Sequence, residues 1–373
     1  ANPDSPTQSD VNYIRKFFNS HYGEGVGDDL AKSIEDAVAE GGSSYQDMVT
    51  NIAGLHRALM ATGDLSGGFR QAAPLGTRFP KIWANANKES VKYAVNPKYY
   101  EAEMRKIADA PDYEVITDKL GVDLTGVGAL QDEAFLGAGY AERIPVAGVA
   151  VKGADRAYTG VLTRMRYDVA HKIVEDAGGP QQYVKNMEEL YGDSMVKKGL
   201  THGSTNKADR AMRSYGEVIN TLTGRGGMKG GALDSHMKTA STLLFAPRLW
   251  AANLQRLNPV WYAKLYRDNP EAAKLAASSA GTFYGMVGSV LGLAVVAGPA
   301  VGVSVGLDGR SADFLKIKYG NTRYDILGGQ QQNIVQIVRQ ITGEKVNSET
   351  GEVQKLGDGF GKKNRLDIFG DML

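Results

Sequence analysis

Side chains that commonly catalyse reactions are few and scattered in this sequence of 373 residues. Its five histidines are His21, His56, His171, His202 and His236. No two of them lie within five residues of each other, and none belongs to an HExxH or HxH motif. The chain has no cysteine, which excludes disulfides, thiol nucleophiles and cysteine-ligated zinc. A transition-metal site would therefore need carboxylates from distant segments to converge on a histidine.

Acidic pairs are the other candidates for chemistry. Asp132-Glu133 and Glu188-Glu189 are sequence neighbours, whereas the two carboxylates of a glycosidase face each other across a cleft. Neighbouring acidic residues are typical of an exposed helix face. The sequence also lacks a GxSxG motif and a GxGxxG motif between a strand and a helix. We therefore expect no catalytic residue, no cofactor and no metal site, and a protein that is not an enzyme.

A glycine-rich segment, GRGGMKGG, occupies residues 224–231. Glycine amides together with Arg225 and Lys229 can in principle form a nest for an anion. However, the GxxxxGK[ST] spacing is absent and no strand pattern precedes the segment. We interpret it as a flexible loop and as a domain boundary.

Charge is balanced overall but unevenly distributed. Forty-three basic residues against forty-two acidic ones give a net charge of +1, which provides no global field for nucleic acid. A basic helix edge formed by Arg156, Arg164 and Arg166 is offset by Asp155 and Asp168. The sequence therefore favours at most non-specific, salt-sensitive contact with DNA.

A charge-free stretch of 33 residues, 275–307, follows a basic segment. The cations of this basic flank fit anionic lipid headgroups, or they form a solvated helix face. The flank consists of Arg248, Arg256, Lys264, Arg267 and Lys274.

Small residues dominate the charge-free stretch, and two GxxxG motifs are formed by Gly281 with Gly285 and by Gly288 with Gly292. Such faces let helix backbones approach closely, in lipid or in a packed assembly. A bilayer core needs about 20 apolar residues in a helix, and residues 281–298 come close to that length. Three interpretations remain open: a buried helix of a homo-oligomer, a segment that enters a membrane, and a buried helix of a monomer.

Periodicity predicts a mainly α fold, an extended multi-helix assembly with small β-hairpins near the C-terminus. Apolar residues at helical spacing predict helices over 155–176 and 208–223, and Asn96-Pro97 is typical of a helix start. After Asp308 the pattern changes to short alternating segments on either side of Gly320-Asn321, which predicts a hairpin.

Beyond this hairpin, Ile334, Val335, Val338 and Ile341 predict the apolar face of a short helix, and Val346 and Val353 flank a second hairpin. We divide the chain into an N-terminal helical region, a helical domain, an apolar segment rich in small residues, and a β-hairpin unit with a loose tail. Their ranges are 1–132, 133–230, 231–307 and 308–373.

Seven segments of the sequence carry a family resemblance. They are AERIPVAG (141–148), DRAYTGVLTRMR (155–166), INTLTGRGG (219–227), LFAPRL (244–249), LQRLNP (254–259), DGRSADFLKIKYGNTRYD (308–325) and TGEK (342–345). In this order they resemble the large polyvalent proteins of tailed bacteriophages. The resemblance covers roughly residues 135–356, and residues 1–130 contribute nothing to it.

This resemblance implies an internal virion protein of a short-tailed phage, packaged near the portal vertex and ejected into the host envelope with the DNA. The implied partners are further copies of the chain, other internal, portal or tail proteins, viral DNA bound non-specifically, and the host inner membrane. No catalytic residue carries over, because the matching segments are not catalytic. The first residue is Ala1, so we expect the C-terminal part of a longer polypeptide rather than a processed chain.

Two alternatives stay open. A static scaffold or portal-associated protein would share the small-residue packing but remain in the particle. A lytic enzyme module would need a cleft in which a glutamic acid has a raised pKa.

Overall fold

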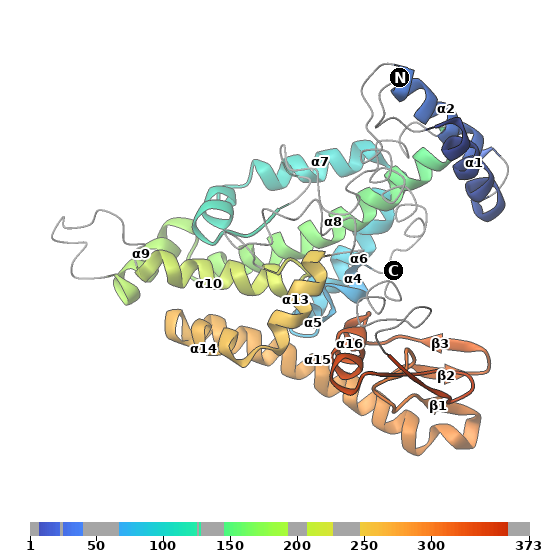
Figure 1. Cartoon of the computed structure of the whole chain (residues 1–373). Coiled ribbons are helices and arrows are strands. Elements are labelled where there is room, and N and C mark those ends of the chain that lie inside the picture. Colours follow the sequence, from blue (N-terminus) through green and yellow to red (C-terminus); the bar gives the residue numbers. More distant parts are fainter. Residues whose placement is uncertain are drawn as a thin grey trace.

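The computed structural model of the chain describes residues 7–22, 25–39, 67–124, 127, 145–192, 207–226 and 247–356 (Figure 1). Within these ranges the fold is mainly helical, as predicted. The N-terminal and central helices are α1 (Gln8–Tyr22), α2 (Val26–Ala39), α4 (Gly67–Arg70), α5 (Ala73–Gly76), α6 (Pro80–Val95), α7 (Pro97–Ala108), the π-helical turn η1 (Val115–Lys119), α8 (Pro145–Asp176), α9 (Pro180–Tyr191) and α10 (Lys207–Leu222). The remaining helices are α13 (Pro247–Leu257), α14 (Pro259–Asp268), α15 (Pro270–Val296), the 3-10 turn η4 (Gly298–Val301) and α16 (Gln330–Thr342).

Three of these helices begin with the same two residues, asparagine and proline. The side chains of Asn96, Asn258 and Asn269 each accept a hydrogen bond from the first turn of α7, α14 and α15 respectively. Proline fits the first helical position because its missing N–H would have no partner there. The prediction of a helix start at Asn96-Pro97 is thus confirmed.

The long helix α8 lies at the centre of the main core (Figure 1), where α6, α7, α9 and α10 pack against it. Leu162, Met165 and Val169 are almost completely buried on it. The same apolar cluster extends from Ala72 to Ala276, so residues from three of the four predicted ranges share one core. By contrast, α1 and α2 pack on each other through Val11, Phe18, Leu30 and Ile34.

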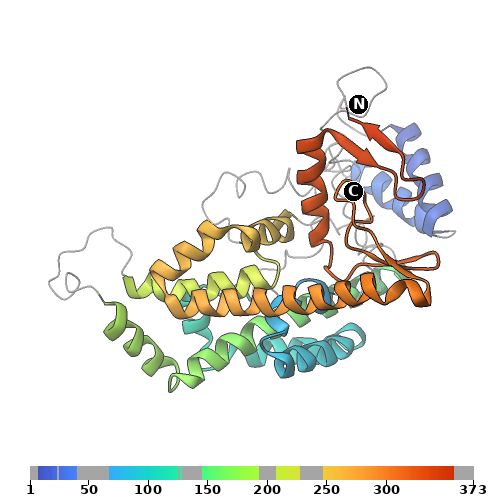
Figure 2. The ribbon, with the colours of Figure 1, turned by 90° about the horizontal axis from the view of Figure 1, so that it is seen from below.

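A small β unit lies against the C-terminal half of α15 (Figure 2). Strands β1 (Val303–Val305), β2 (Ile317–Tyr319) and β3 (Thr322–Tyr324) form an antiparallel sheet in that order. Tyr319 pairs with Thr322 around the Gly320-Asn321 turn, as predicted. Strands β4 (Glu344–Val346) and β5 (Val353–Lys355) form the second predicted hairpin, in which Val346 pairs with Val353.

Helix α16 exists where it was predicted, but its predicted inner face is wrong at one end. Val335 is buried and Ile334 and Val338 are half-buried, whereas Ile341 is 78 % exposed. Ile337 is also exposed. The buried side is largely polar and contains Gln331, Asn333, Gln336 and Arg339.

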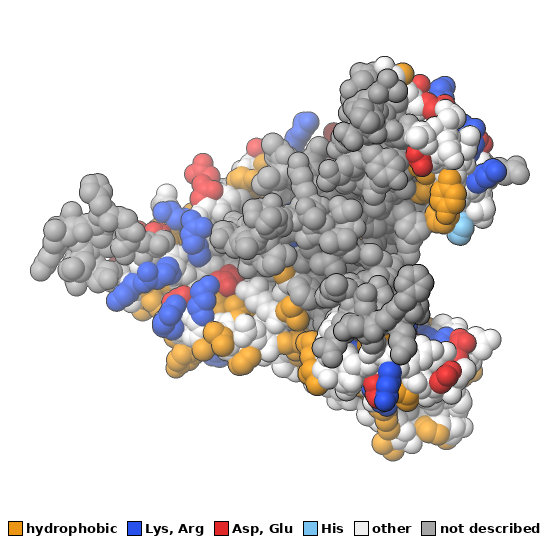
Figure 3. Space-filling view, in the orientation of Figure 1, with side chains coloured by type: hydrophobic (Ala, Val, Ile, Leu, Met, Phe, Trp, Pro, Cys, Tyr) orange, Lys and Arg blue, Asp and Glu red, His pale blue; other side chains and the backbone are white. Residues whose placement is uncertain are grey.

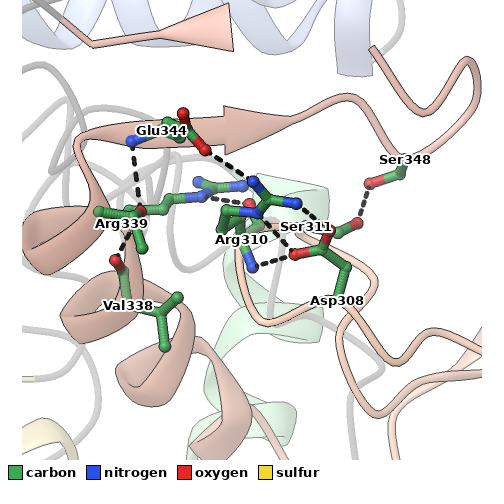
Figure 4. Close-up of polar contacts among 8 residues, drawn as sticks. Asp308, Arg310, Ser311, Val338, Arg339, Glu344 and Ser348 are labelled. Atoms are coloured by element: carbon green, nitrogen blue, oxygen red, sulfur yellow. Dashed lines mark hydrogen bonds and ion pairs between the residues drawn. The ribbon is translucent and has the colours of Figure 1, made fainter. Parts of the chain in front are cut away.

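Arg310 connects three parts of the β unit (Figure 4). Its guanidinium donates two hydrogen bonds to Asp308, of 3.0 and 2.8 Å, and one of 2.6 Å to Glu344 in β4. Its carbonyl accepts a hydrogen bond of 2.7 Å from Nε of Arg339 in α16. Ser311 and Ser348 add a contact of 3.0 Å. These bonds hold the loop after β1, α16 and β4 together.

Replacing Asn269 by alanine is expected to destabilise the core more than the same change at Asn258. Asn269 is 1 % exposed, accepts from the amides of Glu271 and Ala272, and donates to the carbonyl of Ala211 at 2.9 Å. N269A therefore loses a cap and, in addition, the buried hydrogen bond that joins α15 to α10, for a total of about 2–3 kcal/mol. N258A loses an exposed cap only, at about 1 kcal/mol. Urea unfolding measures both, and equal losses would contradict the role of Asn269.

Candidate interaction surface

Helix α15 leaves the main core halfway along its length. Its N-terminal half is buried through Ala272, Ala276 and Ala280. In its C-terminal half, Phe283, Val287 and Leu291 pack against residues of the β unit. The charge-free stretch therefore has one buried face, and its opposite face is free to contact something else.

The four glycines of the two GxxxG motifs lie on that opposite face. Gly281, Gly285, Gly288 and Gly292 are exposed, and their spacing of four, three and four residues places them in one stripe along the helix. A Cβ atom added at any of them meets no atom within 4 Å. The glycines are therefore not required by packing within the chain, and the monomeric core helix is the interpretation that fits them least.

Exposed apolar side chains flank this glycine stripe. Met286 is 58 % exposed, Leu293 69 % and Val296 84 %. Apolar side chains also lie over α14 and near the far end of α15 (Figure 3), among them Val260 and Tyr266. We call the stripe together with Met286, Val290, Leu293, Val295 and Val296 the α15 surface.

Two serine hydroxyls on α15 bond to the backbone of the same helix. Ser289 Oγ donates to the carbonyl of Gly285 at 2.8 Å, and Ser278 Oγ donates to that of Leu275 at 3.2 Å. Such bonds satisfy a hydroxyl without water. Ser289, which lies beside the stripe, is therefore compatible with an apolar environment.

By length and composition, α15 is also the one helix among the described segments that could cross a membrane. A core helix of the same composition would be mostly buried, whereas 28 % of the most apolar part of α15 is buried. Both an assembly and a lipid phase would cover the α15 surface.

The basic flank has four accessible members and one buried one. Lys264, Arg267 and Lys274 are exposed and pair with Glu217, Asp268 and Glu271 at 3.2, 3.0 and 3.8 Å respectively. Arg248 is 44 % exposed and lies 3.9 Å from Asp123. Arg256 is 2 % exposed, so its assignment to a headgroup-facing or solvated flank is wrong.

The three arginines of the predicted basic edge on α8 point into the protein. Arg156 donates to the carbonyls of Tyr93 and Ala94. Arg164 pairs with Asp168 and Glu103 at 2.9 and 3.1 Å. Arg166 is 1 % exposed and donates to Thr223 at 2.7 Å, and burial lowers its pKa to about 10. They are structural groups, so they offer no support for a DNA-binding edge.

Arg225 likewise serves the core instead of a phosphate nest. It is buried and forms an ion pair with Asp123, and burial lowers its pKa to about 10. Lys229 lies outside the described residues.

His171 on α8 takes part in a small polar cluster. Its Nδ1 lies 2.6 Å from Asp112, which is 2 % exposed, and its ring stacks on Tyr167. Tyr167 donates to the other oxygen of Asp112 at 3.1 Å. Sequence spacing missed this cluster because Asp112 and His171 are 59 residues apart.

The described residues contain no cluster of three or more side chains suited to a metal ion. His21 stacks on Phe17, and Glu188 and Glu189 are exposed on α9. His56, His202, His236 and the Asp132-Glu133 pair lie outside the described residues. The α15 surface is therefore the feature of the described structure that most clearly calls for a partner.

Comparison with protein families, curated proteins and solved structures gives no match for this chain. The resemblance to phage polyvalent proteins accordingly stays a hypothesis based on the segments quoted above.

Leucine at Gly288 or Gly292 is expected to weaken self-association about tenfold or more, because the added side chain separates two closely packed helices. The fold should persist, since the added atoms meet open space and leucine favours helix more than glycine does. Ala102→Leu, an exposed position of α7 outside the α15 surface, is the matched control. Sedimentation velocity over a concentration series measures the change. Equal association of all the variants would exclude the stripe from the interface.

Proposed function

We propose that the protein is an interaction protein that self-associates through the α15 surface, as an internal virion protein that builds a core or channel for genome delivery. The observation that carries this proposal is the glycine stripe, whose four positions are exposed, free of internal contacts and flanked by exposed apolar side chains. The sequence resemblance alone suggests that the protein lies inside a phage particle and takes part in genome delivery.

Self-association is favoured by the shape of the surface. Glycines leave a shallow channel along the helix, and Met286, Leu293 and Val296 provide apolar area beside it. A second copy of the same helix is complementary to such a surface, because its backbone enters the channel while its side chains cover the neighbouring apolar residues. This contact joins two copies into a pair, and a ring or tube near the portal vertex would need a second, different contact between pairs.

Contact with the host inner membrane is the second stage of the same proposal. Once the chain has been ejected, lipid can cover the α15 surface in place of virion neighbours, and the exposed cations Lys264, Arg267 and Lys274 can lie near anionic headgroups. Other internal, portal or tail proteins and viral DNA are partners that only the resemblance suggests.

The delivery role predicts that the chain leaves the particle together with the DNA. Ejection triggered in vitro, followed by gel analysis of the emptied particles, should show loss of this chain while capsid proteins remain. Complete retention would instead indicate the static scaffold or portal-associated protein. A peptidoglycan zymogram of the purified chain tests the lytic alternative, and a cleared band would overturn the assignment.

A lysine at Leu293 is expected to abolish membrane association. A charged side chain near the bilayer centre costs about 3 kcal/mol on insertion scales, equivalent to a loss of more than a hundredfold in partition. Leu257→Lys is the control, since Leu257 is an exposed leucine at the end of α13, outside the charge-free stretch. Flotation with vesicles containing anionic lipid compares the two variants with the unmodified chain. Unchanged flotation of L293K would show that α15 does not enter the bilayer.

A further inference from the structure

The face of α6 that points away from the core carries a row of lysines. Lys81, Lys88 and Lys92 are exposed, and their spacing of seven and four residues places them on one line along the helix, about 16 Å long. The buried residues of α6 lie on the opposite side, and the helix packs on α8. We call this row, together with Arg78 and Lys98, which are exposed and flank α6, the α6 basic face.

Carboxylates are scarce along this face. The segment from Arg78 to Lys98 contains five cations and one acidic residue, Glu89, which pairs with Lys92 at 2.9 Å. Arg78, Lys81 and Lys98 form no ion pair within the described part of the chain. The segment therefore has a net positive charge, whereas the chain as a whole is close to neutral.

Two of these cations are placed unfavourably for the helices that carry them. Lys81 is the second residue of α6 and Lys98 is the second residue of α7, and neither helix has an acidic residue in its first turn. The positive end of a helix dipole favours carboxylates at such positions and disfavours cations. The stability of the fold therefore does not explain the two lysines, whereas a bound polyanion would offset both their charges and the helix dipoles.

We propose that the α6 basic face binds the phosphate backbone of a double-stranded nucleic acid without reading its sequence. A duplex presents one negative charge per about 1.7 Å of its axis, so a straight row of cations contacts several phosphates at once. The row contains no aromatic side chain on which the bases of a single strand could stack, because Tyr93 is buried and Trp83 is half-buried. The proposal depends on this face alone and requires neither the resemblance nor the α15 surface.

An anionic membrane is the competing polyanion, and it fits this face less well. Amphipathic helices bind membranes by inserting an apolar face as well as by charge. The apolar side of α6 is packed on α8, and of the large apolar side chains of α6 only Val91 and Val95 are exposed. A nucleic-acid backbone requires no apolar insertion, so the duplex is favoured.

The test is fluorescence anisotropy of a labelled DNA duplex of random sequence, titrated with the full chain between about 50 and 200 mM sodium chloride. Four contacts, one for each cation of the face other than Lys92, predict a slope of log K against log salt of about −3.6, which is a loss of about a hundredfold over this range. Lys81→Gln combined with Lys88→Gln should halve this slope and weaken binding at the lowest salt at least tenfold.

The matched control is Lys185→Gln combined with Lys274→Gln, which removes the same charge from exposed lysines of α9 and α15 and should keep both the slope and the affinity. The conservative pair K81R/K88R should also keep them. Thermal unfolding should give K81Q/K88Q a Tm equal to that of the unmodified chain or higher, because a cation has left the first turn of α6. Sedimentation velocity should show unchanged self-association, so this proposal and that of the α15 surface fail independently.

Equal slopes and affinities for K81Q/K88Q and the control pair would overturn the proposal, and so would the absence of duplex binding by the unmodified chain at the lowest salt. Tighter binding of a single strand of the same length would overturn the assignment to a duplex. Flotation with vesicles containing anionic lipid tests the competing polyanion. Vesicle binding that K81Q/K88Q loses while its duplex binding stays unchanged would assign the face to lipid instead.

Discussion

One buried amide fixes the start of α15, the helix that contains most of the charge-free stretch, relative to the main core. Asn269 caps α15 and at the same time donates to Ala211 in α10. Because both bonds come from the same side chain, the start of α15 is fixed relative to the main core. The direction in which the glycine stripe faces follows from this, since the helix continues without interruption to Val296.

The arginines of the main core are paired with carboxylates or hydrogen-bonded within the protein. Arg164 and Arg225 are paired with carboxylates, and Arg166 is bonded to Thr223 and to the carbonyl of Asp123. These arginines connect segments that are far apart in the sequence, and their long side chains fill space as well as donating hydrogen bonds. A near-zero net charge is thus compatible with a core that contains several cations.

Local signals explain how much of the fold was predictable from sequence. The Asn96-Pro97 helix start, the Gly320-Asn321 hairpin and the Val346–Val353 pairing each depend on a few neighbouring residues, and all three appear in the structure. The exposure of the glycine stripe depends on which face of α15 the other elements cover, and the spacing of residues along the sequence does not predict this. Ile341 was assigned to the inner face of α16 wrongly for the same reason: the buried side of the helix is largely polar, and Ile337 and Ile341 are left exposed. The burial of Arg256 could not be predicted either, because the neighbouring residues of a basic segment do not distinguish a buried arginine from an exposed one.

Helix α15 has 27 residues, which corresponds to a rod about 40 Å long. One end is locked between α9 and α10 through Asn269, and the other carries the β unit and the exposed apolar residues. The first half of the helix is held in the main core through Ala272, Ala276 and Ala280 as well as through Asn269. A partner that docks on the outer half is thereby mechanically connected to the centre of the protein.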